Sequence, residues 1–452
     1  MQDTIVALAT APGIGAIGVI RVSGPNSFPV LNKLFPSKDL LACASHTVQL
    51  GYLKDDDRTI DEVLLTLFKG PRSYTKEDVI EISCHGSQYI IQEILRTLQN
   101  NGIRLAKPGE FTQRAFLNGR FDLAQAEAVA DLISAENETA HKAALNQMRG
   151  GYSEEIKRLR GELIHFASMI ELELDFSEED VEFASREELK SLINQLLKAI
   201  NALIESFRLG NVIKNGVPTV IAGKPNAGKS TLLNALLNEE RAIVSDVPGT
   251  TRDVIEDEIV IDGVHFRFID TAGIRETDDH VEKIGVEKTH EKMKSASMIL
   301  YLSDLSTDSK QEILQELNRL ENLGIPFIMV GNKVDKANNQ LVNELSKDER
   351  FVFISALSKK HLEDLRARIL DMINLDSFKA GNTIVTNARH FESLNLTREA
   401  LLRVIDGIDQ QITNDFLALD IRQSLQHLGE ITGEITTDDL LANIFSKFCI
   451  GK

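Results

Sequence analysis

The alternation of apolar and polar residues predicts a mixed α/β region at the start of the chain. Apolar residues recur at every second position or in short runs, and a helical spacing follows over residues 88–99. The strand-like stretches are residues 4–9, 16–22, 62–68 and 78–84. We therefore expect a mixed α/β domain over residues 1–118.

Beyond Asp122 the spacing changes to three and four residues, which is typical of helices packed along one face. Two such stripes precede the middle of the chain and two follow it. The first pair is Leu123, Ala126, Ala130 and Ile133, then Ile156, Leu159, Leu163, Phe166 and Ile170; the second pair is Leu394, Leu401, Ile405 and Ile408, then Leu417, Ile421, Leu425 and Leu428. We expect these helices to pack together as one discontinuous domain, residues 119–212 and 379–452.

The middle of the chain again predicts strands and helices in alternation. Asp262-Gly263 between two short alternating runs is a hairpin signal. The expected strands are residues 217–222, 259–261, 264–268, 298–302 and 327–330, with a helix over residues 231–237. We therefore expect an α/β domain over residues 213–378 that is inserted at exposed loops of the helical domain. The whole chain is then a multidomain protein that combines α/β and all-α parts.

Composition limits the partners and the compartment. The 452 residues carry a net charge of −18, from 50 basic and 68 acidic side chains, which disfavours broad capture of nucleic acid by this chain alone. A local patch such as Lys157-Arg158-Arg160, or a partner, would then supply basic surface. We expect no membrane span and no signal peptide. Three cysteines without a CxxC pair fit a reducing cytoplasm.

A phosphate-binding loop stands at the head of the inserted domain. Residues 223–230 read GKPNAGKS, the GxxxxGK[ST] pattern, between a predicted strand and a predicted helix. Backbone N–H groups of such a loop wrap a phosphate chain, Lys229 neutralises the β- and γ-oxygens, and the Ser230 hydroxyl binds Mg²⁺.

Further motifs follow the loop in an order and spacing that resemble the GTPase superfamily. They are Thr250-Thr251-Arg252-Asp253, Asp270-Thr271-Ala272-Gly273, Asn332-Lys333-Val334-Asp335 and Ser355-Ala356-Leu357. The Asp335 carboxylate can accept both N–H groups of a guanine edge, and adenine offers no such pair. Asp270 would reach Mg²⁺ through water, and a threonine of the Thr250-Thr251 pair would close on the metal when the γ-phosphate is present.

One position departs from Ras-like GTPases. The residue after the DxxG glycine is Ile274, which cannot orient water as glutamine does. Charge on the β/γ bridging oxygen still needs a positive neighbour. The carbonyl of the Asn226 side chain, inside the phosphate loop, could help to hold a monovalent cation there; it could also be a loop-stabilising amide.

The complete set of motifs resembles the MnmE (TrmE) family of tRNA-modification GTPases. The motifs that carry this resemblance are GKPNAGKST, VPGTTRD, DTAGIR, the N-terminal TIVALATAPGIGAIGVIRVSG, the middle KPGEFTQRAFLNGRFDLAQAEA and the terminal FCIGK. The resemblance implies a potassium-dependent GTP hydrolase of the cytoplasm that dimerises through its G domains. With MnmG (GidA), a partner that contains FAD, it would add a carboxymethylaminomethyl group to C5 of the wobble uridine of certain tRNAs in a heterotetramer-like complex.

The resemblance also implies roles for individual residues. Potassium would be held by Asn226, Ser245, Val247 and Thr250, and magnesium by Ser230 and Thr251, while Glu282 would position the attacking water. The N-terminal domain would bind a tetrahydrofolate derivative, the one-carbon donor, through Arg21, Glu81, Arg120 and Lys452. The residues expected to bind GTP are Asn226, Ala227, Gly228, Lys229, Ser230, Thr231, Ser245, Asp246, Val247, Pro248, Gly249, Thr250, Thr251, Asp270, Thr271, Ala272, Gly273, Asn332, Lys333, Asp335, Ser355, Ala356 and Leu357.

Two other interpretations stay open on the sequence. A GTP-switch factor for ribosome or RNA assembly would lack one-carbon chemistry and would dock RNA through basic modules, which the acidic balance disfavours. A membrane-remodelling GTPase would need an apolar or strongly basic amphipathic surface, and the sequence contains no such pattern.

Overall fold

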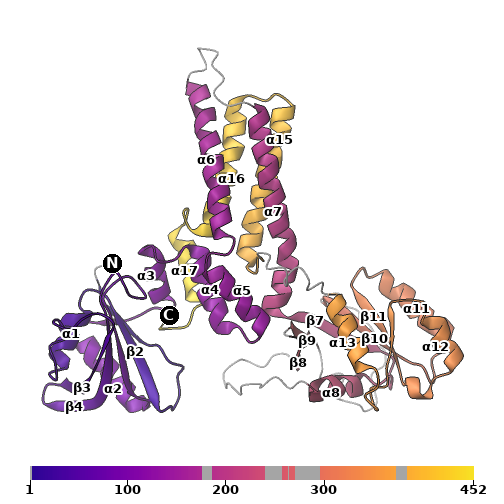
Figure 1. Ribbon diagram of the computed structural model, residues 1–452, viewed down its shortest axis with the longest axis horizontal. Helices are drawn as coiled ribbons and strands as arrows, with labels where there is room; N and C mark the ends of the chain where they lie inside the picture. The colour runs from indigo at the N-terminus through magenta and orange to yellow at the C-terminus, as the bar shows by residue number, and fades with distance from the viewer. Residues whose placement is uncertain are drawn as a thin grey trace. The chain divides into compact units, whose positions relative to one another are not determined.

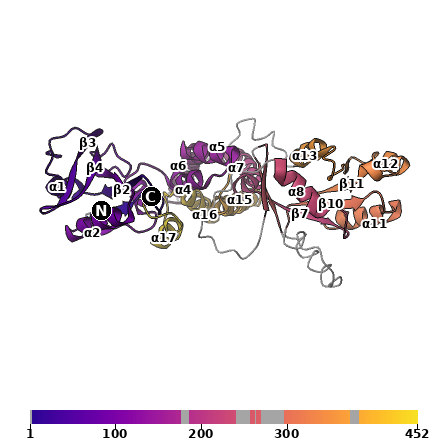
Figure 2. The ribbon, with the colours of Figure 1, turned by 90° about the horizontal axis from the view of Figure 1, so that it is seen from below.

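The computed structural model describes residues 3–175, 186–239, 257–262, 264–269, 296–372 and 384–451. These residues form two compact units (Figures 1 and 2). The first unit comprises Met1–Ser134, Leu145–Leu197 and Ser393–Lys452, and the second comprises Ala135–Ala144 and Lys198–Glu392.

The N-terminal part of the first unit is a six-stranded sheet in the order β3-β4-β5-β2-β1-β6. All neighbours are antiparallel except β1 and β6. Its elements are β1 (Ile5–Leu8), β2 (Ile17–Ser23), α1 (Ser27–Leu34), β3 (Thr47–Asp55), β4 (Arg58–Phe68), β5 (Val79–His85), α2 (Gln88–Asn100), β6 (Arg104–Leu105) and α3 (Glu110–Leu117). Helices α1 and α2 bury apolar side chains against the sheet, Phe28, Leu31, Ile94 and Leu98 among them. The four strands and the helix expected here are confirmed, and β3 and β6 are additional.

Long helices make up the rest of the first unit and enter the second. They are α4 (Leu123–Ser134), α5 (Glu138–Met148), α6 (Ser153–Asp175), α7 (Arg186–Asn215), α15 (Ala388–Asp409), α16 (Asn414–Thr432) and α17 (Asp438–Ser446). Helices α6 and α16 lie side by side and are joined by the Arg422–Glu171 ion pair, 2.7 Å long (Figure 1). The expected stripes are largely buried. Ile133, which is 46% exposed at the end of α4, is the exception.

The second unit contains a sheet in the order β12-β11-β10-β7-β9-β8, parallel except for the β8–β9 hairpin. Its elements are β7 (Val217–Gly223), α8 (Lys229–Glu239), β8 (Asp257–Ile261), β9 (Val264–Phe268), β10 (Met298–Asp304), α11 (Lys310–Glu321), β11 (Phe327–Asn332), the 3-10 turn η1 (Val334–Lys336), α12 (Asn339–Leu345), β12 (Phe351–Phe353) and α13 (Leu362–Asp371). One core joins the sheet to α8 and α13, and another joins it to α11 and α12. Helices therefore cover both faces, as in doubly wound α/β folds, and the expected strands and hairpin are confirmed.

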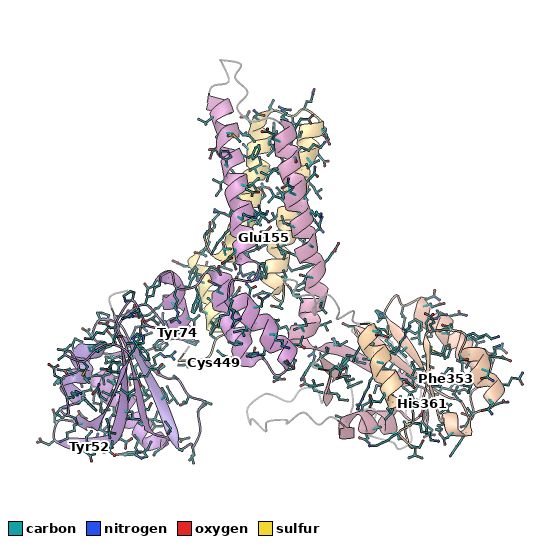
Figure 3. The ribbon with its side chains drawn as sticks, in the orientation of Figure 1. Tyr52, Tyr74, Glu155, Phe353, His361 and Cys449 are labelled. Carbon is teal, nitrogen blue, oxygen red and sulfur yellow. The ribbon has the colours of Figure 1, made fainter. Side chains whose placement is uncertain are left out.

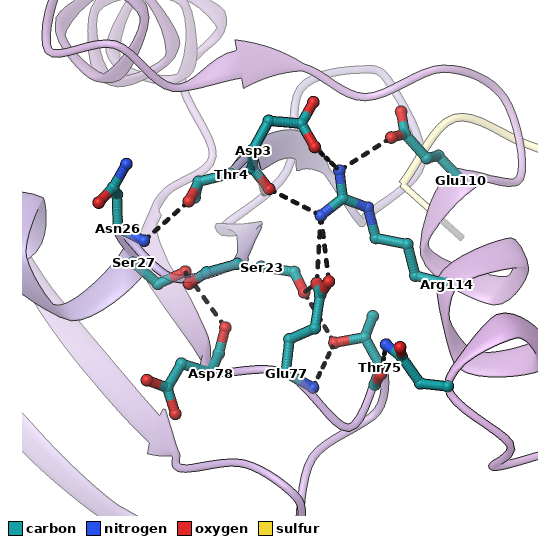
Figure 4. A network of polar contacts seen from close by, with 12 residues as sticks. Asp3, Thr4, Ser23, Asn26, Ser27, Thr75, Glu77, Asp78, Glu110 and Arg114 are labelled. Carbon is teal, nitrogen blue, oxygen red and sulfur yellow. Dashed lines mark hydrogen bonds and ion pairs between the residues drawn. The ribbon is translucent and has the colours of Figure 1, made fainter. Parts of the chain in front are cut away.

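A buried charge network holds the N-terminal domain together around Arg114 (Figure 4). The Arg114 side chain is fully buried and forms ion pairs with Asp3, Glu77 and Glu110 at 2.8, 3.2 and 3.0 Å. Ser23 donates to Glu77 at 2.7 Å. Burial alone would raise the pKa of Glu110, but hydrogen bonds from Arg104, the Lys107 backbone and Arg114 hold that pKa below its ordinary value. The network ties β1, the segment before β5 and α3 to one another.

Replacement of Arg114 should destabilise this domain strongly. Arg114→Ala removes a fully buried cation and leaves the carboxylate of Glu77 without its ion partner, whereas Glu110 keeps Arg104; breaking a buried pair in this way typically costs about 3–5 kcal/mol. Hydrogen exchange in β2 and β5 of the full chain would measure this loss. The control is Arg96→Ala, because the Arg96 side chain is 63% exposed and its partner Glu93 keeps Arg58; this change should alter stability by less than about 1 kcal/mol. A change that small for Arg114→Ala would contradict the role of the network.

Because the pKa of Glu110 is lowered on folding, its share of the stability should be present at neutral pH and lost as pH falls below its unfolded value of 4.5.

Candidate functional site

The nucleotide motifs gather at one edge of the second sheet because their strands are parallel. Strand β7 leads into the phosphate loop, β11 ends at Asn332, and the segment that contains Ser355 follows β12. The carboxyl ends of parallel strands meet at the same edge, where α/β proteins bind ligands. The fold thus brings the phosphate loop to two motifs that lie more than 100 residues further along the chain.

Two glycines allow the phosphate loop to pack closely against its neighbours. Gly223 has φ +145°, and a Cβ there would lie 2.3 Å from the Leu302 carbonyl oxygen. Gly228 has φ +100°, and a Cβ there would lie 2.3 Å from Nδ2 of Asn332. A side chain at either position would force the loop away from β10 or β11. The glycines in the motif therefore serve backbone geometry as well as phosphate access.

Lys229 begins α8 and folds back over the loop. Its Nζ donates to the carbonyl oxygens of Gly223 and Lys224, both at 2.9 Å. Burial lowers its pKa, because water solvates the ammonium group less well there. An ammonium held over the loop at the N-terminal end of a helix is well placed to meet an anion. Ser230 follows in the first turn of α8, half-buried, and Thr231 is exposed.

The Asn332 side chain joins the three motifs. It is 2% exposed; its Nδ2 donates to the Ala227 carbonyl at 2.7 Å, and its Oδ1 accepts from the Ala356 N–H at 3.0 Å. Both ends of one amide are thus used, one on the phosphate loop and one on the segment after β12. The pairing fixes the phosphate loop relative to the segment that follows β12.

Lys333 makes a second connection to the phosphate loop. Its Nζ donates to the Asn226 carbonyl at 3.0 Å and pairs with Asp304 at 2.5 Å. Burial tends to raise the pKa of Asp304, but the hydrogen bonds from Lys333 and Ser306 bring it below its ordinary value. Asn226 has a left-handed backbone, φ +62°, and an exposed side chain. Its amide is therefore accessible at the surface of the loop.

Asp335 lies in η1 beside the segment that follows β12. Its carboxylate is exposed, and a hydrogen bond from Ser355 lowers its pKa, so the group is ionised and remains an acceptor. Ser355 and Ala356 are buried, whereas Leu357 is 82% exposed. An exposed carboxylate flanked by an exposed apolar side chain suits the edge and the face of a purine.

The remaining nucleotide residues lie outside the described residues. These are Ser245, Asp246, Val247, Pro248, Gly249, Thr250, Thr251, Asp270, Thr271, Ala272, Gly273 and the expected catalytic Glu282. The roles assigned to them stay predictions.

A separate cavity lies on the N-terminal domain, and three of the four expected folate residues line it. Its volume is about 510 Å³. The lining residues are Arg21, His46, Phe68, Pro71, Arg72, Ser73, Tyr74, Lys76, Val79, Glu81 and Arg120. The fourth expected residue, Lys452, lies outside the described part of the chain.

Pairing between β2 and β5 explains why Arg21 and Glu81 meet. The two residues are direct cross-strand partners, so their side chains share one face. The guanidinium contacts the carboxylate at 2.8 and 2.9 Å. Arg120 lies over the rings of Tyr74 and Phe121 at 5.0 and 4.9 Å, and the Arg21 guanidinium is also 5.0 Å from the Tyr74 ring. Tyr74, labelled in Figure 3, thus contacts two cationic groups and offers an aromatic surface.

The C-terminal tail reaches this cavity. Arg21 Nη1 donates to the Gly451 carbonyl at 3.4 Å, and the Gly109 N–H donates to the Cys449 carbonyl at the same distance. Gly451 has φ +97°, and a Cβ there would lie 2.3 Å from the Leu8 carbonyl oxygen. Cys449 itself is exposed (Figure 3). Sequence reasoning missed Arg72, Tyr74 and Lys76, although two cations and a tyrosine within five residues were a usable signal.

Within the described ranges, no helix combines the length and the apolar character that crossing a bilayer requires.

Comparison with known proteins gives full-length similarity. Residues 4–120 match the family model described as GTP-binding protein TrmE N-terminus, and residues 123–449 match that described as MnmE helical domain. A protein named tRNA modification GTPase MnmE from Cytophaga hutchinsonii is 60% identical, with 100% of this chain and 98% of the relative covered. Proteins of the same name from Christiangramia forsetii and Flavobacterium psychrophilum are 51% and 52% identical, covering 100% of this chain and 100% and 99% of themselves.

Among solved structures, the G domain of the T. maritima FeoB iron transporter is similar to 34% of this chain, at 24% identity and a TM-score of 0.25, with 97% of that chain covered.

The role of Asp335 predicts a specific change in base preference. Asp335→Asn exchanges an acceptor for a donor, so guanine should lose about 100-fold or more in affinity while xanthine becomes the preferred base. Equilibrium titration with fluorescent guanine and xanthine nucleotides measures this. Asp364→Asn, on an exposed carboxylate of α13, is the matched control. A retained preference for guanine in Asp335→Asn would exclude this carboxylate as the base reader.

Proposed function

The chain belongs to the MnmE (TrmE) family of tRNA modification GTPases, and on that premise we propose that it is a potassium-dependent GTP hydrolase that modifies the wobble uridine of certain tRNAs. Its phosphate loop, base-reading residues and N-terminal cavity support a reaction in which GTP cleavage drives a one-carbon modification complex. The group added would be carboxymethylaminomethyl, at C5 of the uridine.

At the nucleotide site, the described residues suit triphosphate binding and guanine recognition. Lys229 would exchange its two carbonyl partners for phosphate oxygens, and Asp335 would accept the guanine N–H groups. Ser230, in the first turn of α8, and Thr251 would hold Mg²⁺, which stabilises charge on the β- and γ-phosphates when bound. Glu282 would orient the attacking water through a second molecule.

A monovalent cation would take the place that a partner's arginine has in other GTPases. The exposed Asn226 side chain at the turn of the loop is an oxygen donor suited to K⁺, together with Ser245, Val247 and Thr250. Ile274 cannot hydrogen-bond to water, so another positive group must stabilise the charge that develops on the β/γ bridging oxygen. Pairing of G domains in a homodimer would couple this site to the rest of the assembly.

The observation that carries the proposal beyond GTP hydrolysis is the N-terminal cavity. It places Arg21, Glu81 and Arg120 around an aromatic wall. Guanidinium groups suit the carboxylates of a tetrahydrofolate derivative, a carboxylate suits the N–H donors of its pterin ring, and Tyr74 suits its flat faces. A switch factor without one-carbon chemistry has no use for this combination.

The charge distribution supports a partner in tRNA binding. Of the basic patch considered above, Lys157 pairs with Asp122, Arg158 with Glu155 and Glu162, and Arg160 with Glu434. These cations are therefore largely neutralised within the chain. We propose that MnmG supplies both the FAD and much of the surface that holds tRNA, in a heterotetramer-like complex in the cytoplasm.

Potassium dependence has a direct test. Replacement of KCl by NaCl at equal ionic strength should lower GTP turnover about 100-fold, the scale of losing one positive group at the transition state. Asn226→Ala should remove most of the difference between the two salts while GDP affinity changes little. Asn343→Ala, on an exposed side chain of α12, is the control. Equal turnover of the unmodified protein in both salts would refute the cation's role.

The modification itself is tested in cells. Cells that lack this chain should lose the modified wobble uridine from their tRNA nucleosides, as measured by mass spectrometry, and the intact chain should restore it. Glu282→Ala, expressed to the same level, should not. An unchanged nucleoside profile in the deleted cells would contradict the proposal and favour an assembly role.

A further inference from the structure

The N-terminal cavity carries more positive charge than the proposed ligand contacts account for. Four cationic side chains line it, Arg21, Arg72, Lys76 and Arg120, against the single carboxylate of Glu81. This local excess of three positive charges stands in a chain whose net charge is −18.

The four cations fall into two pairs with different surroundings. Arg21 is bound to Glu81, and the two side chains are 18% and 26% exposed. Arg120 lies over two aromatic rings and donates to the Ser73 carbonyl at 2.8 Å. Both are thus fixed in the wall of the cavity. Arg72 and Lys76 belong to the connection between β4 and β5 and, like Arg120, are exposed.

The protein's own contacts orient this connection. Lys76 has a left-handed backbone, φ +59°, and its Nζ donates to the Gly119 carbonyl at 2.8 Å, next to Arg120. The neighbouring carboxylates are engaged elsewhere: Glu77 binds Arg114 and Ser23, and Asp78 accepts from the Gly70 N–H at 2.9 Å. The cations of the segment line the cavity while its acids are held by the scaffold.

We propose that Arg72 and Lys76 form a second anion-binding subsite, for the additional carboxylates of a folate that carries a chain of several γ-linked glutamates. The inference rests on the folate binding proposed above and specifies which form of the ligand is preferred. A folate with one glutamate has two carboxylates, and each further glutamyl unit adds one. Arg21, held by Glu81, and Arg120, held over the aromatic rings, serve the body of the ligand, and Arg72 and Lys76 meet the extended tail.

The size of the expected gain in affinity follows from the exposure of Arg72 and Lys76. Exposed ion pairs are individually weak, so two such contacts together should give about a tenfold gain in affinity for the longer ligand, which corresponds to about 1.4 kcal/mol. Because these charges face solvent, salt should screen the gain; at 0.5 M NaCl the two ligands should bind with similar affinity.

Calorimetric titration of the full chain with 5-formyl-tetrahydrofolate in its monoglutamate and triglutamate forms tests the subsite. At low salt the triglutamate should bind about tenfold more tightly. In Arg72→Gln/Lys76→Gln the two forms should bind with equal affinity, so the readout is the ratio of the two affinities measured on the same protein. Lys33→Gln/Lys38→Gln removes the same charge from exposed positions around α1, outside the cavity lining, and should keep the tenfold preference.

The other outcomes separate the subsite from the folate site itself. If the unmodified chain binds both forms and binds them with equal affinity, the subsite is refuted and the proposed function stands. Binding of neither form overturns both. A double variant that keeps the triglutamate preference but loses affinity for tRNA would assign Arg72 and Lys76 to nucleic acid and would also refute the proposal.

Discussion

The arrangement of the nucleotide site depends on a single buried carboxamide. Asn332 ends β11, donates to the carbonyl of Ala227 in the phosphate loop and accepts from Ala356 after β12. Because both hydrogen bonds are buried, loss of the amide leaves polar groups without partners at two loops at once. Gly228 is required for the same reason, since any side chain there would occupy the space of the Asn332 amide. The parallel sheet supplies the strand ends, and Asn332 sets their loops in register.

The N-terminal domain uses charge in a comparable way. Arg114, fully buried, ties the start of the chain and α3 to the segment that precedes β5. That segment adjoins Arg72 and Tyr74, so a structural network fixes one wall of the cavity. The adjacent Arg21–Glu81 pair lies on the sheet itself and receives the C-terminal tail through the Gly451 carbonyl. The Arg114 network and the cavity therefore belong to the same sheet, but they are built from different charged residues.

Sequence reasoning located the elements that have strong periodicity and the motifs that have fixed chemistry. The strand before the phosphate loop, the β8–β9 hairpin and the long helices were all readable from local pattern. Strand β3 was missed although Val48, Leu50 and Tyr52 alternate along it; these side chains are exposed while Gly51 and Leu53 are buried, so the alternation alone would have assigned the wrong face to the core. Asn332 was expected among the residues that bind GTP. Its two partners could not be specified, since they lie 105 and 24 residues away in the chain. Arg72 and Lys76 belong to a connection without periodicity, and only the folded sheet brings them to Arg21.

The most direct test of the account is the nucleotide affinity of Asn332→Ala, measured by equilibrium titration with fluorescent GDP. Two buried groups left without hydrogen bonds cost about 1–3 kcal/mol each, so affinity should fall by about 30-fold or more. Hydrogen exchange in the N-terminal sheet should stay unchanged. Affinity equal to that of the unmodified chain would show that the loops hold their positions without this amide and would contradict the central claim.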